Sequence, residues 1–177
     1  MVFAGETLRT LPVAIRQARQ GDERLIADVY GDDHLPAEDL ASRVYCQGED
    51  ILDMQRGRRL VWFAIHPSGI PVGTVQLKFF PDHTFGDKVP TAELHYLKVR
   101  RSFEGQGVAS GLNTTLEEAA RARGFRRLVL AVRTHNKRAI DMYKHWGYIN
   151  AGEIKWRFPA YLMTKYLNQS FPAAHAA

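Results

Sequence analysis

Hydrophobic and polar positions along the chain follow two different periods, and their order predicts the succession of elements. Short alternating runs are typical of strands with one buried face, whereas apolar residues three and four positions apart indicate helices. The predicted elements are a strand at 13–18, helices that begin near 22 and 36, strands at 60–65, 72–80 and 93–99, a helix at 108–123, a strand at 128–132, a helix at 136–145 and one or two closing strands within 148–167. This order predicts an α/β fold, with a mixed sheet flanked by helices.

Local signals set several of these boundaries. Asp22 and Asn136 carry short polar side chains of the kind that cap helix N-termini, and Pro36 is favoured in a first helical turn. The sequence His-Pro-Ser-Gly at 66–69 predicts a hairpin between two strands, and the polar run 81–90 predicts an exposed loop. The predicted elements are therefore joined by mostly short connections.

The length and composition favour a single domain. The chain has 177 residues, of which 45% are hydrophobic and 24% charged, and it shows no repeat or low-complexity linker. We expect an N-terminal segment at 1–12, one domain at 13–167 and a flexible tail at 168–177. No apolar run approaches the roughly 18 residues of a membrane helix, and the first residues lack the pattern of a signal peptide. The single cysteine, Cys46, excludes an internal disulfide framework, and these features together favour a cytoplasmic location without membrane attachment.

The net charge of +5 hides a strong polarity along the chain. Residues 98–145 hold eleven Lys and Arg against four Asp and Glu, whereas residues 22–56 hold ten acids against three arginines. One interpretation is that the two regions meet different partners, and the other is that both are solvated helix faces. Charge alone does not decide between them.

A glycine-bearing loop joins the strand at 93–99 to the helix at 108–123. Gly105 and Gly107 let the backbone approach a bulky anion, and the start of the helix presents N–H groups and the positive end of its dipole. Arg100 and Arg101 could add counter-charge, so the loop suits a pyrophosphate; the alternative is a plain strand-to-helix turn. A dinucleotide-binding fingerprint is excluded because Ser110 stands at its third glycine position, and the G-K-[ST] of a P-loop is missing.

Two motifs give these residues a family resemblance. The loop sequence Glu104–Ala109 fits the pattern [Q/R]-x-x-G-x-[G/A] except at its first position. The pattern N-x-x-A-x-x-[L/M]-Y-x-x-x-G-[F/Y] matches Asn136, Ala139, Met142, Tyr143, Gly147 and Tyr148. With both motifs in the expected order, the chain resembles the GNAT superfamily of acetyl-CoA-dependent N-acetyltransferases. The resemblance implies a central mixed, splayed β-sheet, with acetyl-CoA as co-substrate.

The resemblance also implies which residues contact acetyl-CoA. They are Leu97, Lys98, Val99, Gly105, Gln106, Gly107, Val108, Ala109, Ser110, Asn136 and Tyr143. Glu104 departs from the family pattern, which has Arg or Gln at this position. A carboxylate there repels phosphate unless it turns to solvent or pairs with Arg100 or Arg101. We expect no metal, since the seven histidines show no ligand spacing.

The resemblance implies direct attack of an amine on the thioester, which requires three catalytic tasks: deprotonating the amine, stabilising the oxyanion and protonating the departing thiolate. Glu93 matches the position of a glutamate base in many relatives, and His95 is a second candidate with a suitable ordinary pKa. Regular alternation along the strand would put Glu93, His95, Leu97 and Val99 on one face. The Leu97 N–H is the candidate oxyanion donor, and Tyr143 matches the family's general acid. The alternatives are a solvated Glu93, a His95 that fills the sheet face, and a Tyr143 that packs in the core.

The acceptor is implied only as an amine. In the family, the first two helices line the acceptor cleft, and here that region carries Asp32, Asp33, Glu38 and Asp39, which would favour a polyamine, an aminoglycoside or a basic peptide. Solubilising surface charge is the alternative. Two other functions stay open: a non-catalytic acyl-CoA sensor or partner module of the same fold, and a nucleic-acid binder, for which no reader motif is present. The late aromatic residues Trp156, Phe158 and Tyr161 could serve a homodimer or the core.

Overall fold

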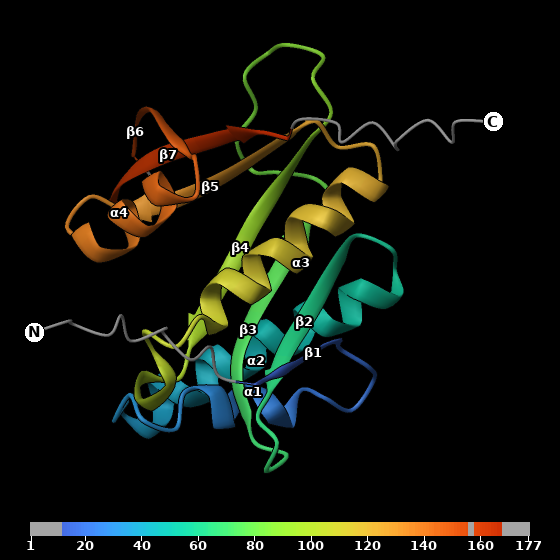
Figure 1. Cartoon of the computed structure of the whole chain (residues 1–177), viewed down its shortest axis with the longest axis vertical. Coiled ribbons are helices and arrows are strands. Elements are labelled where there is room, and N and C mark those ends of the chain that lie inside the picture. The colour runs from blue at the N-terminus through green and yellow to red at the C-terminus, as the bar shows by residue number, and fades with distance from the viewer. Residues whose placement is uncertain (1–11, 156–157, 168–177) are drawn as a thin grey trace, which may run out of the picture. The chain divides into compact units, whose positions relative to one another are not determined.

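The computed structural model describes residues 12–155 and 158–167, and these residues form seven strands and four α-helices (Figure 1). The strands are β1 (Ala14–Gln17), β2 (Arg59–Ile65), β3 (Pro71–Lys78), β4 (Thr91–Val99), β5 (Arg127–Arg133), β6 (Ile149–Lys155) and β7 (Pro159–Tyr166). The helices are α1 (Arg24–Val29), α2 (Ala37–Gln55), α3 (Val108–Ala122) and α4 (Lys137–His145), with a 3₁₀ turn η1 at Arg101–Phe103. Neighbouring strands are hydrogen-bonded in the order β1-β2-β3-β4-β5-β7-β6. The predicted mixed α/β fold is confirmed.

The contacts of the chain divide it into two compact units. Of the described residues, the first unit holds 12–76 and 96–116, and the second holds 77–95, 117–155 and 158–167. Strands β3 and β4 and helix α3 contribute residues to both units. The tail expected at 168–177, most of the segment 1–12, and Trp156 lie outside the described residues. No helix in the described part of the chain is long and apolar enough to cross a membrane.

In the first unit, β1 and β2 pair antiparallel, with Ala14 opposite Ile65. A buried apolar cluster forms where α1 and α2 meet the second strand; it includes Ile26, Ile51 and Phe63, each at most 1% exposed. Burial of such side chains is the main force that holds amphipathic helices in place. The helical stripe predicted after residue 22 therefore contributes to this core.

The two predicted caps have different outcomes. Asn136 caps α4 as expected, because its Oδ1 accepts a hydrogen bond of 3.2 Å from the Ala139 N–H. The expectation for Asp22 is wrong: Glu23 precedes α1, and no side chain caps that helix. The Asp22 carboxylate instead accepts hydrogen bonds from the Arg16 guanidinium at 2.6 Å and the Arg19 N–H at 2.8 Å. The Arg16 bond lowers the pKa of Asp22, so this carboxylate fastens β1 to the turn that follows it.

In the second unit, β5, β7 and β6 lie side by side and pair antiparallel (Figure 1). The pairing of β5 with β7 runs from Arg127 opposite Tyr166 to Arg133 opposite Ala160. β5 is almost wholly buried, as its continuous apolar sequence predicts. It is also the partner of β4, whose course sets the position of the candidate catalytic residues.

Candidate active site

Strands β4 and β5 are paired over only part of their length. Their parallel pairing covers Thr91–Glu93 and Arg127–Val129, although β4 continues to Val99 and β5 to Arg133. This register therefore covers the start of each strand, within the second unit, and the splayed sheet that the resemblance implies stays a prediction.

A left-handed residue interrupts β4. Tyr96 has φ +47°, a conformation that bulky residues rarely adopt. Because an extended backbone is needed for side chains to alternate, the expected single face of Glu93, His95, Leu97 and Val99 does not continue through Tyr96. Glu93 and Leu94 are in fact both buried, although they are consecutive.

The glycine loop has the backbone that its sequence predicts. Gly105 and Gly107 have φ values of +73° and +80°, in the region that strongly favours glycine. The N–H groups of residues 105–110 donate no hydrogen bond to any residue that the structure describes; the first bond of this turn runs from the Gly111 N–H to the Gly107 carbonyl at 3.0 Å. A Cβ placed on Gly105 would meet no atom within 4 Å. The predicted contacts Gln106, Val108, Ala109 and Ser110 thus lie in a loop and first helical turn that fit a diphosphate.

The arginine next to this loop is already engaged. Arg100 Nε donates to Asp32 at 2.9 Å, and both the N–H and the hydroxyl of Ser102 donate to the same carboxylate. Ser102 and, to a smaller degree, Arg100 lower the pKa of Asp32 to about 2. The counter-charge expected from Arg100 is therefore largely neutralised, whereas Arg101 is exposed beside a surface hollow that Asp32 and Ser102 also line.

Lys98 is engaged in the same way. Its Nζ lies 2.7 Å from Asp33 and 5.5 Å from the centre of the Tyr30 ring. The contact predicted for Lys98 would therefore be made by its backbone, as for Leu97 and Val99.

The acidic region 22–56 is less negative than its composition suggests. Five of its ten acids lie in ion pairs; besides Asp22, Asp32 and Asp33, these are Asp50 and Asp53, which face Arg59 at 2.6 and 3.6 Å. Most of the partner cations come from outside the region, so counting charges along the sequence overstated the local field. Glu38 and Asp39 are exposed in the first turn of α2, where their negative charges interact favourably with the positive end of the helix dipole.

Glu93 is a buried carboxylate with one defined hydrogen bond. Its side chain is 5% exposed, and its Oε2 accepts from the Asp82 N–H at 3.0 Å. Burial raises the pKa of Glu93, while the Asp82 N–H and the charge of Lys78 act against that rise. Burial acts to raise the pKa of Asp82, but its bond with Lys78 and, to a smaller degree, the charge of the partly buried His95 lower it. The solvated Glu93 that the sequence left open is thus not what the structure shows.

Tyr143 is a buried phenol in α4. Its ring lies 5.8 Å from that of Trp146 and 5.6 Å from that of Tyr148, both edge to face. Burial raises the pKa of Tyr143, so the phenol keeps its proton at neutral pH. The packing role is observed, and it is compatible with proton donation.

Sequence reasoning missed several residues that shape these regions. Gly73 on β3 leaves room for its neighbours: a Cβ there would lie 3.1 Å from both the Lys98 carbonyl oxygen and Val108. Asp82 and Lys78 border Glu93, although no motif includes them. An isolated glycine within a strand is the one signal that could have indicated Gly73. No group of three or more potential metal ligands occurs among the described residues.

The chain matches a known family. The family model described as Acetyltransferase (GNAT) family matches residues 19–148. A curated protein, probable N-acetyltransferase 14 of Xenopus tropicalis, is 32% identical over 100 residues, which are 56% of this chain and 46% of that protein. The chain therefore spans about half the length of the curated relative that it matches.

Solved structures show the same fold. The chain has a TM-score of 0.72 and 16% identity to a structure described as a GNAT-family acetyltransferase from Desulfovibrio desulfuricans, covering 88% of this chain and 99% of that one. Its TM-score to the PaiA N-acetyltransferase from Thermoplasma acidophilum, in complex with coenzyme A, is 0.69 at 16% identity, covering 87% and 98%. At these identities the likeness is one of fold.

Proposed function

Because the chain belongs to the acetyltransferase (GNAT) family, we propose that it transfers an acetyl group from acetyl-CoA to an amine. The observation that carries the proposal is the open glycine loop, in which two left-handed glycines and the start of α3 leave N–H groups without acceptors among the described residues. Backbone N–H groups at a helix start favour phosphate through both hydrogen bonds and the helix dipole. Residues 105–110 would hold the diphosphate of acetyl-CoA.

Each candidate residue then has a defined task. When bound, acetyl-CoA supplies an acetyl thioester, whose carbonyl carbon forms a bond to the amine nitrogen while its bond to sulfur breaks. Glu93 accepts the amine proton directly or through water, with His95 as the second candidate. The Leu97 N–H donates to the carbonyl oxygen as negative charge develops there. Tyr143 gives its phenolic proton to the departing sulfur.

The burial of the two acid–base groups suits these tasks in opposite ways. A base must be ionised at working pH, and burial brings the pKa of Glu93 closer to neutrality, which makes its carboxylate a better proton acceptor. An acid must carry its proton, and burial ensures this for Tyr143. The environment of each group therefore supports the role that its motif implies.

The acceptor we propose is a cationic amine. The exposed carboxylates Glu38 and Asp39 support a cation, although pairing of Asp32 and Asp33 makes the attraction smaller than composition implies. Structures of this fold include an aminoglycoside 6′-N-acetyltransferase and a spermidine/spermine N-acetyltransferase from Vibrio cholerae, so the fold serves polycations elsewhere. A homodimer stays a prediction, as does the absence of a nucleic-acid partner.

Release of free thiol from acetyl-CoA tests the function directly. The assay uses polyamines, aminoglycosides, amino acids and basic peptides at low and high salt, beside calorimetric titration with coenzyme A. We expect saturable binding and turnover with at least one cationic amine. Absence of saturable binding to folded protein would overturn the proposal, whereas binding without turnover on any amine would favour the acyl-CoA sensor. Better turnover of neutral or anionic amines at low salt would refute the cationic acceptor.

A further inference from the structure

The loop between β3 and β4 brings a set of charged groups to Glu93. Lys78, the last residue of β3, places its Nζ 2.5 Å from the Asp82 carboxylate. The backbone N–H of the same Asp82 donates to Glu93 Oε2 at 3.0 Å. Asp82 therefore links Lys78 to Glu93: its side chain pairs with Lys78, and its main-chain N–H donates to Glu93. All three residues belong to the second unit.

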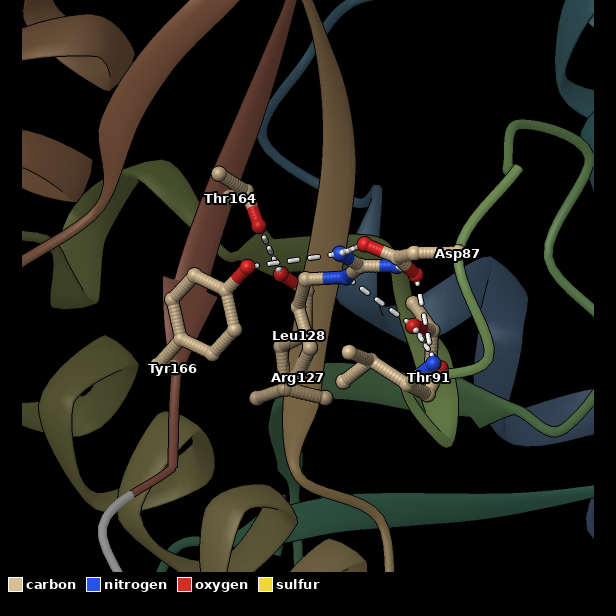
Figure 2. A network of polar contacts seen from close by, with 7 residues as sticks. Asp87, Thr91, Arg127, Leu128, Thr164 and Tyr166 are labelled. Carbon is tan, nitrogen blue, oxygen red and sulfur yellow. Dashed lines mark hydrogen bonds and ion pairs between the residues drawn. The ribbon is translucent and has the colours of Figure 1, made fainter. Parts of the chain in front are cut away.

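The far end of this loop is fastened to β5. The Arg127 guanidinium, in a side chain 3% exposed, donates to both oxygens of Asp87 at 2.7 and 2.8 Å and to Thr91 Oγ1 at 3.0 Å (Figure 2). Its Cζ also lies 4.2 Å from the centre of the Phe85 ring. Paired guanidinium–carboxylate bonds of this kind fix orientation as well as distance. The loop is thus held near its start by the Lys78–Asp82 ion pair and near its end by Arg127.

Glu93 needs such support because it is buried. A buried carboxylate with a single neighbouring donor is sensitive to every nearby charge. Besides burial and the Asp82 N–H, the charges of Lys78, Asp82 and His83 act on the pKa of Glu93. Against the effect of burial, Lys78 and, to a smaller degree, His95 and His83 lower the pKa of Asp82.

We propose that Lys78 and Asp82 are positioning residues for Glu93: their ion pair holds the loop so that the Asp82 N–H fixes the carboxylate in the orientation and charge state that accepting a proton requires. Neither residue has to touch the substrate. The inference rests on the proposed function, in which Glu93 is the base, and adds residues that lie outside both family motifs.

The two members of the pair act on Glu93 with opposite sign. The positive charge of Lys78 lowers the pKa of Glu93, and the negative charge of Asp82 raises it. Lys78→Met should therefore raise the pKa of Glu93, because Asp82 is left without its counter-charge. Asp82→Asn should lower it, while the backbone N–H and an oxygen that can accept from Lys78 are both kept. A merely structural pair would not move one titration in opposite directions.

Two measurements follow this titration. The first is kcat/KM against pH, which falls on the acid side as the base becomes protonated. The second is the carboxyl carbon shift of Glu93 by NMR in protein without acetyl-CoA, assigned by its loss in Glu93→Gln. We expect both midpoints to move to higher pH in Lys78→Met and to lower pH in Asp82→Asn. Lys88→Met is the control, because Lys88 is an exposed lysine of the same loop that is absent from the charges acting on Glu93.

The possible failures are distinguishable. If both variants leave the NMR midpoint of Glu93 unmoved, or move it in the same direction, the positioning role is wrong whatever the reaction is. If Glu93→Gln keeps wild-type kcat/KM instead of losing about 10²- to 10⁴-fold, the assignment of the base in the proposed function is wrong, and the positioning role for catalysis falls with it. Opposite movement of the midpoint in both measurements supports the proposal.

Discussion

Replacing Gly105 with alanine tests the central claim about the glycine loop. Gly105 has φ +73°, and a residue with a Cβ pays about 1–2 kcal/mol in that left-handed conformation. A Cβ at this position meets no atom within 4 Å, so the cost is one of backbone strain and not of collision. The loop N–H groups form no bond to the described residues that would hold the strained form, and we expect the free loop to relax.

Binding of coenzyme A must then restore the left-handed conformation. A cost of about 1–2 kcal/mol corresponds to a roughly five- to thirty-fold weaker affinity, since 1.4 kcal/mol is tenfold. The methyl group would also occupy the open space in front of the loop, which adds to the loss if the diphosphate lies there. The stability of the free protein should change little.

Gly57→Ala is the matched control. Gly57 has φ +69°, and a Cβ there also meets nothing within 4 Å, but its N–H donates to the Met54 carbonyl at 3.0 Å at the end of α2. The strain should therefore stay in the folded state and lower Tm by about 2–8 °C, at about 2–4 °C per kcal/mol for a chain of this length. The affinity for coenzyme A should not change.

Calorimetric titration of coenzyme A into each protein, with thermal unfolding followed by circular dichroism, separates the two effects. We expect weaker binding with little loss of Tm for Gly105→Ala, and a lower Tm with unchanged binding for Gly57→Ala. A Gly105→Ala protein that binds coenzyme A within twofold of wild type would show that this loop does not hold the diphosphate. Weaker binding by both variants would show that affinity follows general stability instead.

The remaining predictions concern single side chains. Tyr143→Phe keeps the buried ring and removes the proton, so kcat should fall about 10²- to 10⁴-fold with little change in coenzyme A affinity; wild-type turnover would remove Tyr143 from the mechanism. Glu104→Gln should tighten coenzyme A binding, most clearly at low salt, and unchanged or weaker affinity would show that this carboxylate does not face the diphosphate. Asp32, with its pKa lowered to about 2, should stabilise the fold above its ordinary pKa of 3.8 and lose that contribution as pH falls toward 2. In Asp32→Asn, acid unfolding curves should lose part of their slope over this range; curves that keep their wild-type shape would contradict the ion pair.

The succession of elements follows from the sequence because it depends on local periodicity. Every predicted strand and helix is present within a few residues of its expected bounds, and the cap at Asn136 is formed. The cap at Asp22 fails because Arg16, six residues earlier on another element, binds the carboxylate. The break at Tyr96 has no local signal either, since tyrosine does not favour a positive φ. The first difference comes from a side-chain contact between two elements, which hydrophobic periodicity does not encode, and the second has no signal in the sequence.

For the candidate site too, features set by local sequence were predictable, and features set by contacts between distant residues were not. The glycine loop was predictable because glycine adopts positive φ more readily than other residues, and Gly105 and Gly107 both have positive φ. The burial of Glu93 and its contact with Asp82 were not, because they depend on how an eleven-residue-distant loop segment folds back. The ion pairs of the acidic region were not predictable for a related reason: Asp33 and Lys98 are 65 positions apart, so composition counts their charges without showing that they cancel.

The ion pairs around β4 also bear on how the chain would recognise an anion. Lys98, Arg100 and Arg101 are the basic side chains that lead into the glycine loop; Lys98 and Arg100 are neutralised by neighbouring aspartates of the α1–α2 connection, whereas Arg101 is exposed. Arg101 and Glu104 carry opposite charges, so the side chains nearest the loop in sequence bring little net positive charge to it. We therefore expect recognition of a diphosphate in this unit to rest mainly on backbone N–H groups and the dipole of α3, whose positions are fixed by the backbone. A site of that kind depends on the conformation of Gly105 and Gly107 and not on any one cation, which is why a single methyl group is the sharper test of it than the removal of an arginine.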